Sequence, residues 1–130
     1  MKPEEKDLLL KDLCARLPYG TKVKCPLDDE LYTLLSINWN KEIVVIGFMM
    51  DEMYVTSKQK LVDIKPYLRP LSSMTEEEKL EFSLVPIYAF AHYNEIAKID
   101  WLNEHHFDYR GLIDKGLAIE VTEDNNPYKD

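Results

Sequence analysis

The chain has 130 residues, of which 24 are acidic and 16 basic, so its net charge is −8. A chain of this length fits one domain, and we expect residues 1–130 to fold as a single unit. The basic residues are dispersed among the acidic ones, which disfavours nucleic-acid binding. No apolar run approaches the roughly 20 residues that span a bilayer. No secretory leader is recognisable either, so we expect a cytoplasmic protein without a membrane partner.

Cysteine and glycine usage excludes several kinds of site. Cys14 and Cys25 are the only cysteines, and neither lies at ligand spacing from a second cysteine or a histidine. We therefore expect two reduced thiols and no structural zinc. None of the four glycines are closely spaced, which argues against a phosphate-binding loop, and no nucleophile motif is present. Catalysis is disfavoured, and no cofactor is expected.

Residues 3–17 are predicted to form the first helix. Pro3 suits the first helical position, and acidic residues follow it at the positive end of the helix dipole. Leucines then recur at three- and four-residue spacing and give one apolar face. Pro18 and Gly20 indicate where the helix ends.

From residue 21 to residue 68 the pattern changes to short β segments. The turns between them are too short for crossover helices, so the strands are expected to pair as an antiparallel meander. Such a small sheet must curl to bury its apolar face. We expect a small five-stranded SH3-like barrel over residues 21–68, with an OB-like barrel as the alternative. The predicted strands are 21–25, 31–39, 42–48, 53–56 and 60–64.

Residues 75–121 are predicted to form a helical C-terminal segment, which the chain reaches through a proline-containing exit from the barrel. Thr75 and Glu78 form a capping box for a short helix that ends near residue 83. The apolar stretch 84–94 has no firm period and fits a strand, a helix or a packed loop.

A second helix is predicted over residues 95–107, and its pattern continues to about residue 115. Gly116 suits a left-handed cap there, and residues 117–121 fit a closing strand. Residues 122–130 are polar and predicted to be mobile. The expected fold class is therefore α+β: an N-terminal helix, a small barrel, and a helical segment with a closing strand.

His105 and Asp108 are the candidates for metal chemistry, because a three-residue spacing places them on one face of a helix. His106 cannot join them there, since adjacent helical side chains diverge by about 100°. His92 is a distant fourth group. Two ligands are too few for a metal site, and an imidazole packed against an apolar edge is the more common situation.

Aromatic residues provide the other candidate surface. Small barrels often bind peptides through exposed aromatic side chains, although the same rings also fill small cores. On the helical segment, Arg110 is expected to pair with Asp114, four residues on. The predicted partner-binding residues are Trp39, Tyr54, Tyr67, Trp101, His105, His106, Tyr109 and Arg110.

Three passages carry a resemblance: LKDLCARLPYGTKVKC, IKPYLRPLSSMTEEEK and DWLNEHHFDYRGLIDKGLAIE. Together they resemble a recurring group of small uncharacterised bacterial proteins from prophage and mobile-element neighbourhoods of gut anaerobes. The resemblance spans most of the chain, and residues 83–95 contribute least to it. It implies a bacterial, cytoplasmic, phage-derived protein, and it implies no activity, substrate or site residue.

The favoured function is a non-enzymatic adaptor module that binds a protein, with the oligomeric state left open. This function predicts an exposed apolar patch of more than a few hundred Å². An alternative is an acidic nucleic-acid mimic that inhibits a DNA-binding protein, which requires carboxylates concentrated on one face. A further alternative is a metal-dependent hydrolase that uses His105 and Asp108.

Overall fold

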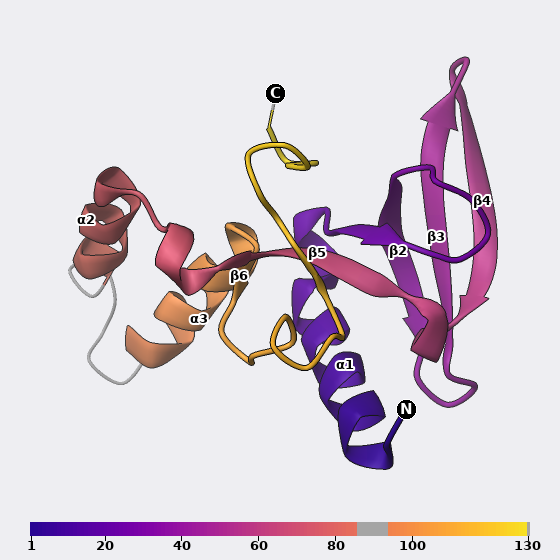
Figure 1. The fold of residues 1–130 in the computed structure, drawn as a ribbon, viewed down its shortest axis with the longest axis horizontal. Coiled ribbons are helices and arrows are strands. Elements are labelled where there is room, and N and C mark those ends of the chain that lie inside the picture. Colours follow the sequence, from indigo (N-terminus) through magenta and orange to yellow (C-terminus); the bar gives the residue numbers. More distant parts are fainter. Residues whose placement is uncertain (86–93, 130) are drawn as a thin grey trace.

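The computed structural model describes residues 1–85 and 94–129, and it has an α+β architecture (Figure 1). The helices of this part are α1 (Pro3–Arg16), α2 (Glu76–Leu84) and α3 (Asn94–Glu104), with 3-10 turns at Leu17–Tyr19, Leu61–Asp63 and Leu71–Ser73. The strands are β1 (Lys22–Lys24), β2 (Tyr32–Asn38), β3 (Ile43–Met50), β4 (Met53–Lys60), β5 (Lys65–Pro70), β6 (Phe107–Asp108) and β7 (Ile119–Glu120). Most of the stretch 84–94, for which three structures were considered, lies outside the described residues.

The first helix is confirmed. Pro3 occupies its first turn, where a missing N–H costs nothing, and Leu9 and Leu13 are completely buried against the sheet. After α1 the chain makes a 3-10 turn that contains Pro18, and Gly20 then takes a left-handed conformation with φ 66°. Glycine adopts this conformation without steric cost, so the chain can reverse directly into β1.

The strands follow an antiparallel meander up to β4, and β5 then returns to pair with β1. The resulting order is β4-β3-β2-β1-β5. The strands predicted at 53–56 and 60–64 are wrong in detail, because β4 runs unbroken through Met53–Lys60. The true fifth strand, Lys65–Pro70, lies where two prolines had indicated an exit from the sheet.

The sheet is open, so the expected closed barrel is not confirmed. Within the described part of the chain, no pairing joins β4 to β5. β5 instead leaves β1 and pairs in parallel with β7 and then with β6, so its backbone groups are used by the C-terminal segment. Figure 1 shows β5 crossing from the strand layer to the helices.

The capping box at α2 is confirmed. The Thr75 hydroxyl accepts a hydrogen bond from the Glu78 backbone N–H at 3.1 Å, and the Glu78 carboxylate accepts one from the Thr75 N–H at 3.0 Å. The Glu78 carboxylate also accepts hydrogen bonds from both terminal nitrogens of Arg69, at 2.6 and 2.8 Å. This bidentate pair ties α2 to β5 and, with the backbone donor, lowers the pKa of Glu78 to about 2.

The prediction that α3 continues to residue 115 is wrong. His106 has a positive φ of 65°, which ends the helical path, and Phe107–Asp108 then pairs with β5. The Asp108 carboxylate accepts the backbone N–H groups of Leu112 and Ile113, at 2.9 and 3.0 Å, and so holds the turn that follows. Gly116 is left-handed as predicted, with φ 74°.

Two groups of buried side chains hold the elements together. The larger lies between α1, the curved sheet and the segment after β6, and the smaller joins Trp101, Leu102 and Phe107 with the inner side of α2. Cys14 is exposed and Cys25 buried, and both are free thiols. No helix in the described ranges is long and apolar enough to cross a membrane.

Candidate interaction surface

Tyr109 and Arg110 lie beside a buried ion pair on α1. Asp12 and Arg16 are fully buried and 2.7 Å apart, and Arg16 also donates to the Phe107 carbonyl at 2.6 Å. The Arg110 Nε lies 3.5 Å from Asp12, as a charge contact without hydrogen-bond geometry, in place of the predicted pairing with Asp114. Both guanidinium groups lie 5.2 Å from the centre of the Tyr109 ring. These residues therefore attach the C-terminal segment to α1.

His105 and Asp108 do not share a helical face. The His105 ring stacks on Trp101 with ring centres 4.0 Å apart, and its Nδ1 is 2.9 Å from the Trp101 carbonyl oxygen. The Asp108 carboxylate is occupied by the backbone donors of the next turn. In residues 1–85 and 94–129, no three potential ligands from His, Cys, Asp and Glu gather as a metal site requires. His92 lies outside the described residues.

Tyr128 occupies a gap between β1 and β5. Its hydroxyl accepts a hydrogen bond from the Lys22 backbone N–H at 3.0 Å and donates one to the Tyr67 carbonyl at 2.7 Å. The two strands pair directly at the next position, where Val23 lies opposite Pro66. The hydroxyl therefore completes the ladder where the strands separate, and the C-terminal segment, predicted to be mobile, is docked at this residue.

The His106 ring stacks on Tyr128 with ring centres 3.6 Å apart. Burial is the main reason that the pKa of His106 falls to about 4, and the nearby Arg16 charge lowers it further. Burial also raises the pKa of Tyr128. Both side chains are uncharged at neutral pH and pack the C-terminal segment on the sheet. Their observed contacts are structural.

Trp39 and Arg110 are the two predicted residues that lie together in one groove. Trp39 projects from the turn between β2 and β3 and is largely exposed. With α1 it lines a groove of about 440 Å³, whose other residues are Asp7, Leu10, Lys11 and Cys14. Lys11 and Asp7 pair with each other at 3.2 Å, so the walls carry no strong excess of either charge.

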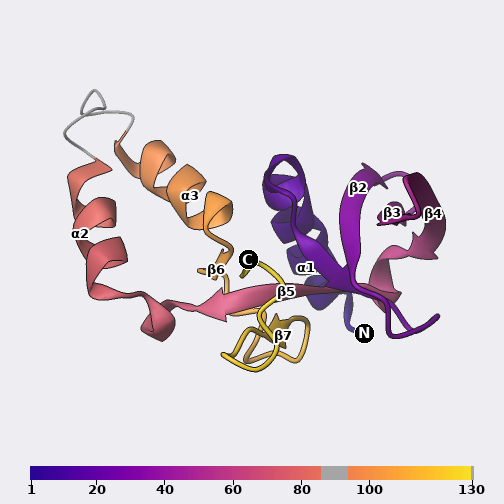
Figure 2. The same ribbon diagram turned by 90° about the horizontal axis from the view of Figure 1, so that it is seen from above.

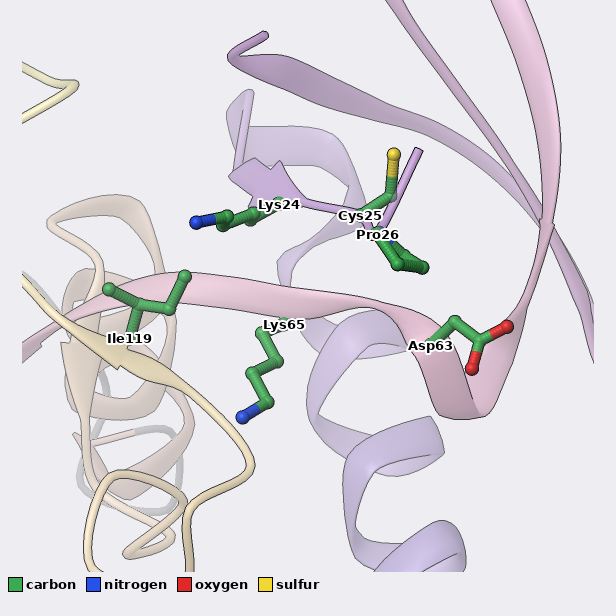
Figure 3. A pocket seen from close by; sticks show the side chains of 6 residues that line it. All are labelled: Lys24, Cys25, Pro26, Asp63, Lys65 and Ile119. Carbon is green, nitrogen blue, oxygen red and sulfur yellow. The ribbon is translucent and has the colours of Figure 1, made fainter. Parts of the chain in front are cut away.

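A second pocket, of about 360 Å³, lies between β1 and β5 (Figure 3). Lys24 and Lys65 face each other directly across this strand pair, and neither forms an ion pair with a described residue. The Cys25 sulfur points away from the Lys65 side chain in Figure 3, and Asp63 lies at the far side. The pocket is cationic and offers no nucleophile beside its ammonium groups.

The end of the β3–β4 hairpin carries four exposed apolar side chains close together in the fold. Met49, Met50, Met53 and Tyr54 are 59%, 55%, 72% and 49% exposed. Taking about 200 Å² for a residue of this size, they leave roughly 470 Å² in contact with water. This area is divided between the two faces of the hairpin, because Met49 pairs with Tyr54 and Met50 pairs with Met53 at successive positions. Figure 1 shows this hairpin projecting from the body of the molecule. We call these four residues the hairpin tip.

The backbone at the hairpin tip reverses in a two-residue turn. Asp51 and Glu52 both have positive φ, 49° and 68°, as in the tight turns that match strand twist. Below the turn, the Tyr54 ring lies over Gly47, where a Cβ atom would come within 2.7 Å of the ring. A glycine at this position therefore lets the aromatic ring lie flat across the sheet.

The eight residues predicted for partner binding do not form one surface. Trp39 and Tyr54 are exposed, Trp101 is buried, and the others are partly buried in packing contacts between elements. Sequence analysis identified Tyr54 but missed the three methionines beside it. The signal was available as two short apolar runs, Phe48–Met50 and Met53–Val55, separated by an acidic pair.

In comparisons with known proteins, no family model, curated protein or solved structure matches this chain.

Proposed function

We propose that the protein is a non-enzymatic adaptor module that binds another protein through the hairpin tip. The observation that carries the proposal is the exposure of Met49, Met50, Met53 and Tyr54 at the end of a projecting hairpin. Large apolar side chains that are exposed close together, here on both faces of one turn, often mark binding sites.

Folding explains the turn but not the exposed methionines. Positive φ at Asp51 and Glu52 is what a two-residue hairpin turn requires, whereas water-exposed methionines contribute little to the stability of the chain. Methionine side chains are flexible and polarisable, so they adapt to the shape of an apolar partner surface. A binding role explains the exposure of these side chains.

The geometry supports an acidic nucleic-acid mimic and a metal-dependent hydrolase less well. An acidic mimic requires carboxylates on one face, whereas the charged residues within β1–β5 are all basic. A hydrolase built on His105 and Asp108 requires side chains that already have other partners.

We infer that β1–β5 are an open variant of the SH3-like meander, and the return of β5 to β1 after a 3-10 turn supports this. The bacterial, mobile-element origin implied by the resemblance is likewise a proposal, as is the cytoplasmic location.

The test is affinity capture from the organism that encodes the protein. The wild type is compared with a Met50→Glu/Met53→Glu variant, which places two charges in the hairpin tip without touching a buried residue. The matched control is Leu27→Glu/Leu80→Glu, because the two leucines are nearly as exposed on average as the two methionines and lie elsewhere in the fold.

We expect one protein to be captured by the wild type and by the control, and to be lost with the tip variant. Circular dichroism and unfolding curves should show that all three proteins are equally folded. If the tip variant retains the captured protein, the hairpin tip is not the binding site and the proposal fails.

A further inference from the structure

β4 is the edge strand of the sheet formed by the described residues. It pairs with β3 over eight consecutive residues with no register shift, and no other described strand pairs with it. Figure 2 shows β4 on the outside of the molecule, away from α1 and the C-terminal helices. Natural sheets protect such edges with charges, prolines or bulges. The half of β4 from Met53 to Thr56 has none of these.

The strand register places the charged side chains of β1–β5 on one face of this sheet. Lys58 and Lys60 lie opposite Val45 and Ile43, which alternate with the buried Val44 and Ile46, so both lysines point to the outer face. The same alternation places every charged residue of β1–β5 on that face, and all are basic: Lys22, Lys24, Lys58, Lys60, Lys65 and Arg69. Acidic residues are excluded from these strands, although the chain has an excess of them.

The side-chain chemistry of β4 therefore differs between its two ends. It begins beside the acidic turn Asp51–Glu52, continues with the apolar Met53 and Tyr54, and ends with two lysines that form no ion pair with described residues. A strand added at this edge would place side chains directly opposite each of these groups.

We propose that β4 takes up an extended acidic–apolar segment of the partner protein as an additional antiparallel strand. This inference rests on the proposed function, because the segment's apolar end would cover the hairpin tip. Its carboxylates would lie two residues apart, opposite Lys60 and Lys58, and its apolar residues opposite Val55, Tyr54 and Met53. A second copy of this chain does not meet these requirements, because its own β4 contains no acidic residue.

The probe is the peptide ETETTVYV, which has this pattern when aligned antiparallel to residues 60–53. The control peptide KTKTTVYV differs only in the sign of its two charges. Each is titrated into the full chain, with the dissociation constant from fluorescence anisotropy and the contact site from backbone amide NMR shifts. The matched protein variant is Lys58→Glu/Lys60→Glu, which changes two exposed side chains.

We expect the acidic peptide to bind the wild type about tenfold more tightly than the basic peptide, since each cross-strand charge pair contributes a few-fold. The preference should invert in the charge-reversed variant, and the shifts should be largest along β4. Equal affinity for both peptides, no inversion, or shifts away from β4 would each overturn the inference.

The capture experiment separates this inference from the proposed function. If the tip variant loses the partner and Lys58→Glu/Lys60→Glu keeps it with full affinity, the hairpin tip binds the partner and the added strand is refuted. If both variants keep the partner, the proposed function itself fails. Sedimentation velocity tests whether a second copy of this chain occupies the edge instead. Concentration-dependent self-association through β4 would also overturn the inference.

Discussion

Replacing Tyr128 with phenylalanine removes one oxygen atom and tests whether the C-terminal segment completes the sheet. The hydroxyl bridges the Lys22 N–H and the Tyr67 carbonyl, at 3.0 and 2.7 Å. Without it, a partly buried backbone donor and acceptor lose their partner, while the ring still fills its space on His106. Such unsatisfied groups cost about 1–3 kcal/mol each, so with partial access to water we expect a loss of about 2 kcal/mol.

The assay is urea unfolding, with the free energy of unfolding taken from the midpoint and slope. The slope should stay unchanged, because the surface exposed on unfolding is nearly the same. Tyr19→Phe is the matched control: Tyr19 is also partly buried, and its hydroxyl makes no hydrogen bond with a described residue. If Tyr128→Phe changes stability by less than about 0.5 kcal/mol, as expected for the control, the bridging role is refuted.

Three further predictions concern the packed core and the hairpin. Asp12→Ala leaves the Arg16 charge buried without its partner, so urea unfolding should show a loss of about 3–5 kcal/mol. Gly47→Ala places a Cβ atom 2.7 Å from the Tyr54 ring and 2.9 Å from a backbone oxygen, so thermal unfolding should show a loss of about 1–3 kcal/mol. His106 has a folded-state pKa near 4, below its ordinary 6.5, so the unfolded state takes up the proton first as the pH falls. The stability due to neutral His106 is therefore present above pH 6.5 and lost between pH 6.5 and 4, and His106→Phe should make the measured decline in this window shallower.

Each of these predictions has a result that contradicts it. A double variant Asp12→Ala/Arg16→Met that is less stable than Asp12→Ala alone would show that the unpaired charge is not the cause of the loss. A Gly47→Ala protein as stable as the wild type would show that the ring and the carbonyl move aside freely. If the stability of His106→Phe falls with pH as steeply as that of the wild type, His106 is not the source of the decline.

Local sequence signals predicted the local features well. Pro3 marked the start of α1, the Thr75 and Glu78 pair marked the start of α2, and Gly116 marked a left-handed position. Each of these signals depends on a steric or hydrogen-bonding property of one residue and its close neighbours. Such properties act in the same way whatever the rest of the chain does.

Longer-range features could not be predicted in this way. The strand β5 contains Pro66 and Pro70, which argue against a strand, yet its remaining backbone groups pair with β1, β6 and β7 from distant parts of the chain. His106 interrupts a good helical pattern because Phe107 packs into the smaller core and pairs with Arg69. The barrel is not closed: β5 pairs with β1 and then with β7 and β6 from the end of the chain, and no pairing among the described strands joins it to β4.

The candidate site was predicted only in part for the same reason. Tyr54 was recognised as an aromatic residue of a strand, but the exposure of its methionine neighbours depends on how far the hairpin extends beyond the core. Trp101, His106 and Tyr109 looked like surface candidates because they are unusual residues close together in sequence. Their packing on α2, Tyr128 and α1 became visible only with the full set of tertiary contacts.

Site-specific photo-crosslinking tests the binding role of the hairpin tip most directly. A photoreactive phenylalanine analogue is placed at Met53 or, as a control, at the similarly exposed Leu80, and the cells that normally make the protein are irradiated. Our proposal predicts one discrete adduct with another protein from position 53 and none from position 80. No adduct from position 53, or the same adduct from both positions, would contradict it.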